Sequence, residues 1–320
     1  MNKNIVVLEN LLRDSPDLGN KVKNTAVLLR EGIRVPLSIG LKYDMYTEQM
    51  KDILPEIKKV VVQNSDYTII ADKIKNIILE SDFKFSKDVM SAISEYMPRA
   101  KYFAVRSSGA PIVSGKEIAE DSSGVSLAGQ YESYLMVPVE HIPKAILLCY
   151  ASLFSERVLR AFDVKNDLSY FNSRMSVLIQ EMFPSDLSAV VMTNDPVEED
   201  DVFGIEITYG ACEALVSGKV QGDLYLLNRN NGEIIDVQKG SKTCYIEHQP
   251  FSNTSNSNEQ IFETPSSKRE QLSATTEIIA RIFNIGMQIE KIFGVPQDIE
   301  LVVFDNEIGV VQSRPITTNN

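Results

Sequence analysis

Residues 294–317 read GVPQDIELVVFDNEIGVVQSRPIT and contain two extended runs rich in β-branched residues. Turn-forming residues separate the runs, so the stretch predicts a β-hairpin. Glu300 lies in the first strand and Gln312 and Arg314 end the second, so antiparallel pairing brings the three side chains to one end of the hairpin. Carboxylate and amide oxygens suit a hard cation and a guanidinium suits phosphate oxygens, as a magnesium nucleotide requires. An ordinary hairpin closed by a Glu–Arg pair would contain the same residues.

The composition is that of a globular protein. The 320 residues are 43% hydrophobic and 24% charged, enough for two or three lobes with a large core. An excess of 44 acidic over 32 basic residues gives a net charge of −12, which argues against a general affinity for nucleic acid or an anionic membrane. Three cysteines without metal-ligand spacing predict reduced thiols, and the lack of a signal peptide or an 18-residue apolar run predicts a cytoplasmic protein.

The first structured segment is a helix followed by a strand. Gly19 precedes a helical pattern, Gly32 ends it, and a strand is entered through Pro36. Lys21 lies at the start of this helix, where the N-terminus also attracts anions, so it is a candidate for phosphate contact. A solvated surface lysine is the alternative interpretation.

A second candidate region follows the apolar strand predicted at 103–108. This strand delivers Arg106 and two hydroxyls into a long loop rich in Gly, Ser and acidic residues, which we expect to be mobile. Further on, Gly129 lets the backbone approach a ligand closely, and Ser133 offers a hydroxyl. Such a loop can cradle phosphates through its N–H groups, although it is neither a Walker A sequence nor a G-x-G-x-x-G turn.

The middle of the chain alternates between core and possible site. Residues 142–162 predict an amphipathic core helix, and 176–182 and 187–193 predict two strands. Gln180 and the backbone after it, through Met182, lie at the predicted joint between two lobes. Such a joint is a common place for a purine, although an ordinary core strand fits the same residues.

The last third adds a strand, a hairpin and a helix. The strand at 201–208 runs into a glycine-flanked segment that places Glu213 at a possible site. Residues 225–237 predict a hairpin around Asn-Asn-Gly. The long amphipathic helix predicted at 272–293 is stopped by Gly294 and leads back to the hairpin quoted first.

In this order, the segments resemble the nucleotide-binding domain of the phosphoenolpyruvate synthase, pyruvate phosphate dikinase and rifampin phosphotransferase family, an ATP-grasp fold. The resemblance covers nearly the whole chain, through LGNKVKNTAVLLREGIRVP, VRSS, EDSSGVSLAGQYESYL, YASLFSERV, VLIQEMFPSDLSAVVMTNDP, YGACEALVSGKVQGD, FGVPQDIE and VQSRPIT. It implies an α/β (α+β) fold of two lobes, 1–183 and 184–320, with the nucleotide bound between them. The first lobe would carry the phosphate loop and adenine hinge, and the second the metal and phosphate site.

The resemblance also implies roles for particular residues. Three cationic side chains would contact the phosphates and assist transfer, and the metal would be magnesium. The implied positions are Lys21 and Arg106 on the phosphates, Gly129 and Ser133 in the phosphate loop, Gln180 and Met182 at the adenine hinge, Glu213 as the family's glycine-flanked glutamate, Glu300 and Gln312 on magnesium, and Arg314 on the terminal phosphates.

The implied activity is that of an ATP-dependent phosphotransferase that binds Mg-ATP and passes phosphoryl or pyrophosphoryl to an acceptor outside the chain. Family members continue into a swivelling phosphohistidine domain and a substrate domain, so the acceptor would be a histidine on a partner carrier domain or a small molecule. Neither His141 nor His248 stands in the carrier motif. A catalytically silent nucleotide-binding regulatory module and an ATP-grasp ligase with an acyl-phosphate intermediate are the alternatives.

Two segments of the sequence differ from what the family resemblance leads us to expect. The loop between Arg106 and Gly129 is longer than expected, which would reshape the phosphate lid. Gly-Ala-Cys-Glu replaces the usual Gly-Leu-Gly-Glu at 210–213, which reduces the expected backbone flexibility of that turn.

Overall fold

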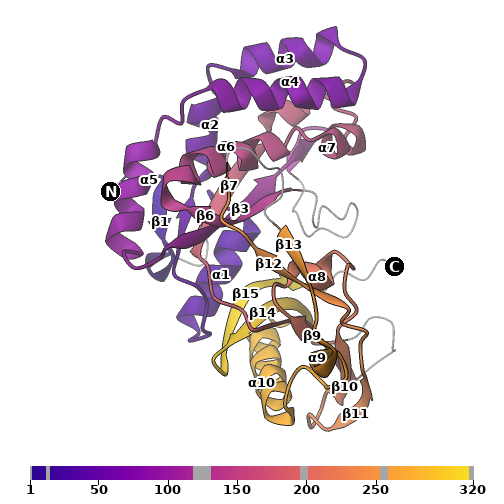
Figure 1. Cartoon of the computed structure of the whole chain (residues 1–320). Coiled ribbons are helices and arrows are strands. Elements are labelled where there is room, and N and C mark those ends of the chain that lie inside the picture. Colours follow the sequence, from indigo (N-terminus) through magenta and orange to yellow (C-terminus); the bar gives the residue numbers. More distant parts are fainter. Residues whose placement is uncertain (1, 12–14, 118–130, 195–200, 253–258, 317–320) are drawn as a thin grey trace. The chain divides into compact units, whose positions relative to one another are not determined.

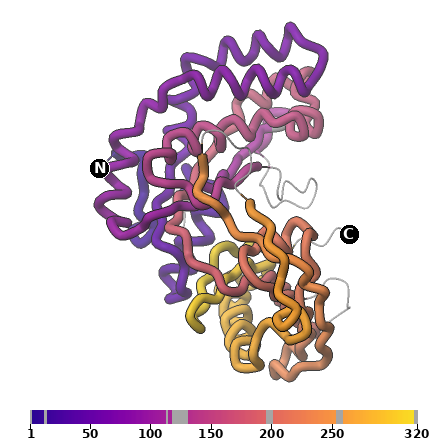
Figure 2. Tube along the Cα trace, viewed as in Figure 1, coloured from indigo at the N-terminus to yellow at the C-terminus, as the bar shows by residue number. Residues whose placement is uncertain are grey.

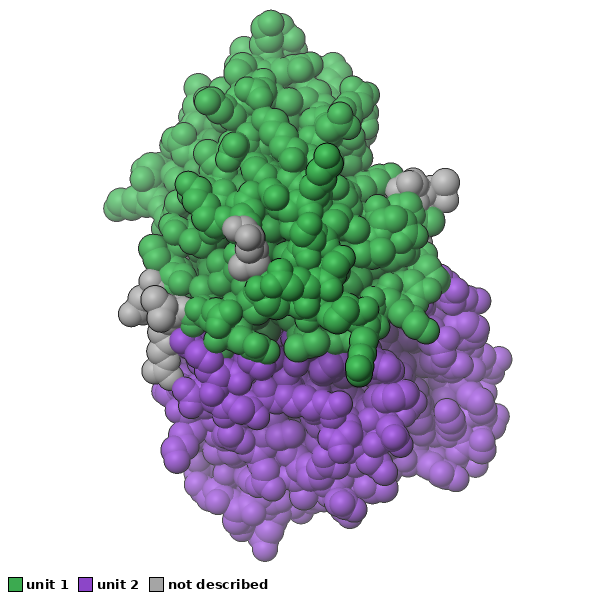
Figure 3. Space-filling model, turned by 90° about the vertical axis from the view of Figure 1, so that its left-hand side faces the viewer, with its two compact units in different colours: residues 1–26, 37–182, 250–256 green, residues 27–36, 183–249, 257–320 purple. Residues whose placement is uncertain are grey.

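A computed structural model describes residues 2–11, 15–117, 131–194, 201–252 and 259–316. The chain divides into two compact units (Figure 3). Unit 1 comprises residues 1–26, 37–182 and 250–256, and unit 2 comprises residues 27–36, 183–249 and 257–320. The main division thus lies one residue from the expected boundary at 183/184, with two short segments assigned across it.

Unit 1 is built on an antiparallel sheet. In the described part of the chain this sheet has five strands in the order β1-β2-β7-β3-β6 (Figure 1). Their bounds are Ile5–Val7 for β1, Ser38–Leu41 for β2, Arg174–Glu181 for β7, Tyr102–Ala110 for β3 and Ser133–Pro138 for β6. Two shorter strands, β4 (Ile112–Val113) and β5 (Lys116–Glu117), pair with each other.

The helices of unit 1 pack mainly on one face of this sheet. Fully buried isoleucines at 70, 74 and 78 recur every four residues on α4, the spacing of a single helix face. Figure 2 shows the α3 and α4 helices side by side. The helix bounds are Asn20–Arg30 for α1, whose residues from 27 onward belong to unit 2, Tyr43–Met50 for α2, Leu54–Gln63 for α3, Tyr67–Glu80 for α4, Ser86–Tyr96 for α5, Ile142–Ser152 for α6 and Glu156–Ala161 for α7, with 3-10 turns Leu8–Asn10, Val139–His141 and Leu168–Asn172.

The single helix predicted at 142–162 was wrong, because the structure has two helices there. The chain leaves α6 after Ser152, and the Ser155 hydroxyl accepts a hydrogen bond from the Val158 N–H at 3.4 Å, which starts α7. The prediction of core was right, since nearly every residue of α6 is buried. A helix buried all round is not amphipathic, so its hydrophobic period could not reveal the break.

The two faces of the unit 1 sheet differ in chemistry. One face joins the helices in a continuous apolar core that includes Phe103, Val105, Val177 and Ile179. Because side chains alternate along a strand, the residues between these point to the other face. We call that surface the unit 1 polar face; its polar members are Ser38, Arg106, Ser108, Ser176 and Gln180, it also carries Ala104 and Leu178, and all of these are buried.

Unit 2 is built on a second antiparallel sheet. Over the described residues it has six strands in the order β11-β10-β9-β8-β14-β15. The strand bounds are Ile234–Gln238 for β11, Asp223–Asn228 for β10, Val202–Tyr209 for β9, Leu187–Met192 for β8, Gln297–Phe304 for β14 and Glu307–Pro315 for β15, and β12 (Cys244–His248) pairs separately with β13 (Glu259–Glu263). The helices are α8 (Glu213–Val216), α9 (Ser266–Arg269) and α10 (Thr276–Phe293).

Helix α10 closes the apolar face of the unit 2 sheet. Its buried Ile279 and Ile282 share a core with Ile205 and Leu301 of the strands. The helix begins four residues later than predicted, because the Thr275 hydroxyl caps it by accepting a hydrogen bond from the Ile278 N–H at 3.3 Å. The predicted stop is confirmed, since Gly294 adopts a left-handed φ of 74°.

The hairpin predicted from residues 294–317 is confirmed as β14 and β15. Asp305 and Asn306 have φ values of 49° and 61° and form a two-residue turn. The hairpin predicted at 225–237 is also confirmed, as β10 and β11. All three cysteines are free thiols. Of the described helices, none combines the length and the apolar character needed to cross a membrane.

Candidate functional site

The β14–β15 hairpin brings two of the predicted metal ligands together. Glu300 lies directly opposite Gln312, and Gln312 Nε2 is 3.2 Å from Glu300 Oε1. A register shift follows Glu300 on β14, so the ladder is irregular at this pair. Both side chains are half-buried and lie on the sheet face opposite α10. The carboxylate and the amide are thus adjacent and accessible.

Arg314 is held two pairs further along the hairpin by an aspartate. The Arg314 Nε and Nη2 atoms donate to Asp298 Oδ2 at 2.8 and 2.6 Å, and Asp298 lies opposite Arg314 in the register. Asp298 is only 9% exposed, so the guanidinium is oriented by a largely buried carboxylate. The sequence interpretation missed Asp298, although its place two residues before Glu300 puts it on the same face of the strand.

Further polar side chains share this face of the unit 2 sheet. Glu206 is aligned with Glu300 across the intervening Val190, and its Oε1 accepts a hydrogen bond from the Gly222 N–H at 2.9 Å. Within the described ranges, no group of three or more His, Cys, Asp or Glu side chains could hold a metal ion by itself. We call this surface the unit 2 polar face; its members are Ser188, Glu206, Thr208, Asp298, Glu300, Gln312 and Arg314.

Arg106 lies inside the unit 1 sheet, which corrects the expectation that it is delivered into a loop. Strand β3 continues through the two serines to Ala110, and Arg106 is only 7% exposed. The segment expected to be a mobile loop therefore begins as strand, and β4 and β5 follow it. The strand extends this far because β7 pairs with β3 as far as Ala110.

Lys21 is the second residue of α1, as predicted. Its Nζ donates to the Ser107 carbonyl at 2.9 Å, and its N–H donates to the Ser108 hydroxyl at 3.1 Å. Both acceptors immediately follow Arg106 in the sequence. Lys21 is therefore bonded to the two residues of β3 that follow Arg106, the other predicted phosphate ligand of unit 1.

Gln180 lies in the middle of the unit 1 polar face. It is 1% exposed, between Ser38 and Ala104 on the adjacent strands. Its Nε2 has no hydrogen-bond partner among the residues that the structure describes. A buried donor without an acceptor costs about 1–3 kcal/mol, so a hydrogen bond from this amide to a ligand acceptor would recover free energy. The Met182 N–H already donates to the Tyr102 carbonyl at 3.0 Å, which removes one of the backbone donors expected at the hinge.

The remaining predicted positions are more scattered. Ser133 begins β6 directly opposite Arg106 and is exposed, whereas Gly129 lies outside the described residues. Glu213 is the first residue of α8, and its Oε2 is 3.1 Å from the Nε2 of the buried His248. This pair could not be predicted from local patterns, because 35 residues separate its members.

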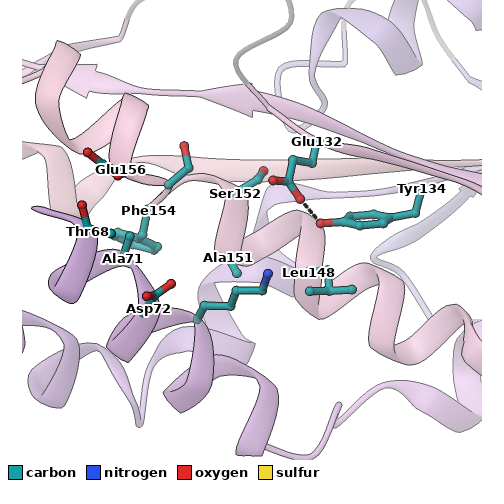
Figure 4. A pocket seen from close by; sticks show the side chains of 12 residues that line it. Thr68, Ala71, Asp72, Glu132, Tyr134, Leu148, Ala151, Ser152, Phe154 and Glu156 are labelled. Carbon is teal, nitrogen blue, oxygen red and sulfur yellow. Dashed lines mark hydrogen bonds between the residues drawn. The ribbon is translucent and has the colours of Figure 1, made fainter. Parts of the chain in front are cut away.

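A pocket of about 180 Å³ lies in unit 1, lined by α4, α6 and the start of β6 (Figure 4). Glu132 and Tyr134, which flank Ser133, line it and are hydrogen-bonded to each other. Burial, followed by the Glu132 charge, raises the pKa of Tyr134 well above its usual range. None of the predicted site residues that the structure describes lines this pocket, so it is separate from the predicted site.

Comparison with known proteins identifies the family. Residues 15–320 match the family described as pyruvate phosphate dikinase, AMP/ATP-binding domain. This chain belongs to that family, and the resemblance inferred from the sequence is confirmed. The mixed α/β fold in two units agrees with the fold class that the resemblance implied.

Several curated relatives are similar over most of the chain. It is 31% identical to a rifampicin phosphotransferase of Bacillus subtilis over 94% of its own length and 33% of the relative. It is 26% identical to a probable phosphoenolpyruvate synthase of Methanocaldococcus jannaschii over 99% of its length and 27% of the relative. The chain thus spans about a third or less of the length of these relatives. Among solved structures, a D-alanine-D-alanine ligase from Helicobacter pylori aligns with a TM-score of 0.37 and 11% identity, over 93% of this chain and 57% of the ligase.

Proposed function

We propose that this chain is the ATP-binding module of an ATP-dependent phosphotransferase, which binds Mg-ATP and passes a phosphoryl or pyrophosphoryl group to an acceptor. One observation carries the proposal furthest. In a member of an AMP/ATP-binding family, Gln312 Nε2 lies 3.2 Å from Glu300 Oε1, and the Arg314 guanidinium is held by Asp298 two pairs along the hairpin, on the same face.

The residues present fit a magnesium ion. Magnesium in nucleotide sites is held by one or two carboxylates together with phosphates and water, so a site without three acidic ligands is suitable. The Gln312 amide donates to Glu300, and rotating it by half a turn directs its oxygen to a cation beside the carboxylate. When bound, magnesium would neutralise charge on the phosphates.

Three cationic side chains would supply the rest of the charge. Phosphoryl transfer depends chiefly on positioning and on neutralising charge that develops in the transition state. We assign this role to Arg106, Lys21 and Arg314, with Asp298 orienting the Arg314 guanidinium. Ser133, which lies opposite Arg106, would contact the phosphates from the start of β6, and Gly129 would belong to the same phosphate loop.

The purine would be recognised from unit 1. The buried Gln180 amide can donate to a ring nitrogen, which would satisfy the hydrogen-bonding capacity that the protein leaves unused. Met182 would contribute its side chain and carbonyl, since its N–H is already bonded. Glu213 is a further nucleotide contact in this proposal, placed by its position in the glycine-flanked segment.

The acceptor would be a histidine on a phosphohistidine carrier domain or a small molecule. The name of one relative, rifampicin phosphotransferase, supports a small-molecule acceptor, and the carrier histidine is what the family resemblance implies. The relevant experiment incubates the chain with Mg-ATP and either rifampicin or a carrier domain with pyruvate, and measures AMP and ADP.

The proposal predicts a nucleotide product, AMP for pyrophosphoryl transfer or ADP for phosphoryl transfer, whose formation requires one of these acceptors and is lost in Glu300→Gln. Tight ATP binding without product from any acceptor would instead indicate a catalytically silent regulatory module. Rapid ATP cleavage without an acceptor would indicate a self-contained hydrolase.

A further inference from the structure

Helix α1 begins against a strand that is distant in sequence. Gly19, the residue before the helix, has no side chain that could accept a hydrogen bond from the first helical N–H groups. The Ser108 hydroxyl on β3 fills this role, since the Lys21 N–H donates to its Oγ at 3.1 Å. Ser108 is fully buried and 87 residues away from Lys21. The N-terminus of α1 is therefore capped by a residue of the same chain that is distant in sequence.

The close approach requires glycine at position 19. A Cβ atom added there would lie 2.1 Å from Ser108 Oγ and 2.6 Å from Ser108 Cβ. The Cβ atom would also lie 2.6 Å from the Ser108 carbonyl oxygen, which belongs to the strand backbone and cannot move aside as a side chain can. Gly19 and Ser108 thus form one contact. Either a side chain at position 19 or loss of the Ser108 hydroxyl would disturb it.

The side chain of Lys21 is anchored to the same strand. Its Nζ donates to the Ser107 carbonyl at 2.9 Å, so main chain and side chain of the lysine are both held by β3. Arg106 is the preceding residue, and it shares the unit 1 polar face with Ser108 because strand side chains alternate. The separation between the Lys21 and Arg106 cations is therefore fixed through this strand.

The same serines also reach the strand that follows the phosphate loop. The Ser107 hydroxyl donates to the Glu132 carbonyl at 2.6 Å, next to Ser133. Ser107 is fully buried, so this hydrogen bond is shielded from water. The two serines after Arg106 therefore tie α1 and β6 to one strand.

We propose that Ser108 is a positioning residue that holds Lys21 beside Arg106 for binding the nucleotide phosphates. A lysine is a flexible point charge, so an anchored backbone and amine reduce the freedom it must lose when it meets a phosphate. The proposal rests on the phosphate roles of Lys21 and Arg106 given above.

The test compares Ser108→Ala with Ser176→Ala in the whole chain. Ser176 lies opposite Ser108 on β7, is equally buried, and donates its hydroxyl to the Leu41 carbonyl of β2 at 2.8 Å, not to a residue of α1. Amide hydrogen exchange at Lys21 should accelerate in Ser108→Ala and not in Ser176→Ala. The Kd for Mg-ATP should rise about fivefold in Ser108→Ala alone, in line with a lost helix cap.

A double-mutant cycle separates positioning from general destabilisation. In the Lys21→Ala background, Ser108→Ala should change the Kd by less than about twofold, because the residue it positions is gone. Losses that multiply, or unchanged exchange at Lys21 in Ser108→Ala, would overturn the proposal. If Ser108→Ala is too unstable to purify, Gly19→Ala forces α1 away from an intact β3 and carries the same expectations.

The cycle also distinguishes failure of the inference from failure of the proposed function. Accelerated exchange in Ser108→Ala, together with normal ATP binding and turnover in Lys21→Ala, would uphold the cap but refute a role in binding phosphates. Weaker ATP binding in Lys21→Ala, together with an effect of Ser108→Ala on the Kd that is the same in both backgrounds, would uphold the role of Lys21 in binding phosphates but refute positioning by Ser108.

Discussion

The two sheets are alike in layout and unlike in charge. Each has one apolar face covered by helices and one polar face. The members of the unit 1 polar face are buried, and include a cation and an amide but no carboxylate. The unit 2 polar face contains three carboxylates, and its Glu300, Gln312 and Arg314 are half-exposed. Unit 1 therefore suits an anion and a purine, and unit 2 suits a metal ion.

The difference also explains how each face keeps its side chains in place. On the unit 1 polar face, burial within a sheet limits the movement of Arg106 and Gln180. On the unit 2 polar face, cross-strand partners do this, as Asp298 does for Arg314. A pre-organised site can be built by either means, since both reduce the freedom lost on binding.

The largest expected effect comes from removing the guanidinium that we propose binds the terminal phosphates. Arg314→Ala should reduce the rate of phosphate transfer about 10³-fold, because the charge it neutralises grows in the transition state. Asp298→Asn should lose only about tenfold, since it acts through Arg314. Single-turnover rates at saturating Mg-ATP measure both. Equal losses in the two variants would mean that Asp298 does more than orient the arginine.

The apolar and polar faces of unit 2 should differ in their effect on stability. Phe203 is fully buried beneath α10, with its ring 4.9 Å from that of Phe283, so Phe203→Ala should lower the free energy of unfolding by about 3–5 kcal/mol. Glu300→Gln should change it by less than about 1 kcal/mol, because a half-exposed polar residue contributes little packing. Urea denaturation distinguishes them. Comparable destabilisation would show that Glu300 is structural.

The smallest expected change in stability concerns Gln180. Replacing Gln180, whose amide nitrogen has no partner among the described residues, with the similarly shaped methionine should leave the free energy of unfolding unchanged or raise it by up to about 1 kcal/mol. The same Gln180→Met variant should bind ATP about tenfold more weakly, as measured by calorimetry. A destabilised variant with normal ATP affinity would place Gln180 among the ordinary core residues.

Local sequence signals predicted the elements but not their long-range partners. The β-branched runs around Asp305 and Asn306 specified the β14–β15 hairpin, and its register then placed Glu300 beside Gln312. Single segments singled out candidate residues such as Glu300, Gln312 and Arg314, and the family resemblance supplied the roles that it implies for them. The cap that Ser108 provides for α1 could not be predicted, because it joins residues 87 positions apart.

The errors arose where burial removed the pattern that prediction uses. The break between α6 and α7 was hidden because α6 is apolar on every side. Strand β3 extends past Ser108 because β7 pairs with it, and serines and glycine give no local sign of a strand.

We propose that the purine and phosphates bind at the unit 1 polar face and that Glu300 and Gln312 hold the metal. Calorimetric titration with ATP, in the presence and absence of magnesium, distinguishes these two contributions. Glu300→Gln should therefore keep the ATP affinity measured without magnesium and lose the gain that magnesium provides. Gln180→Met should weaken binding in both conditions. A Glu300→Gln variant that retains the full magnesium-dependent gain would contradict the assignment.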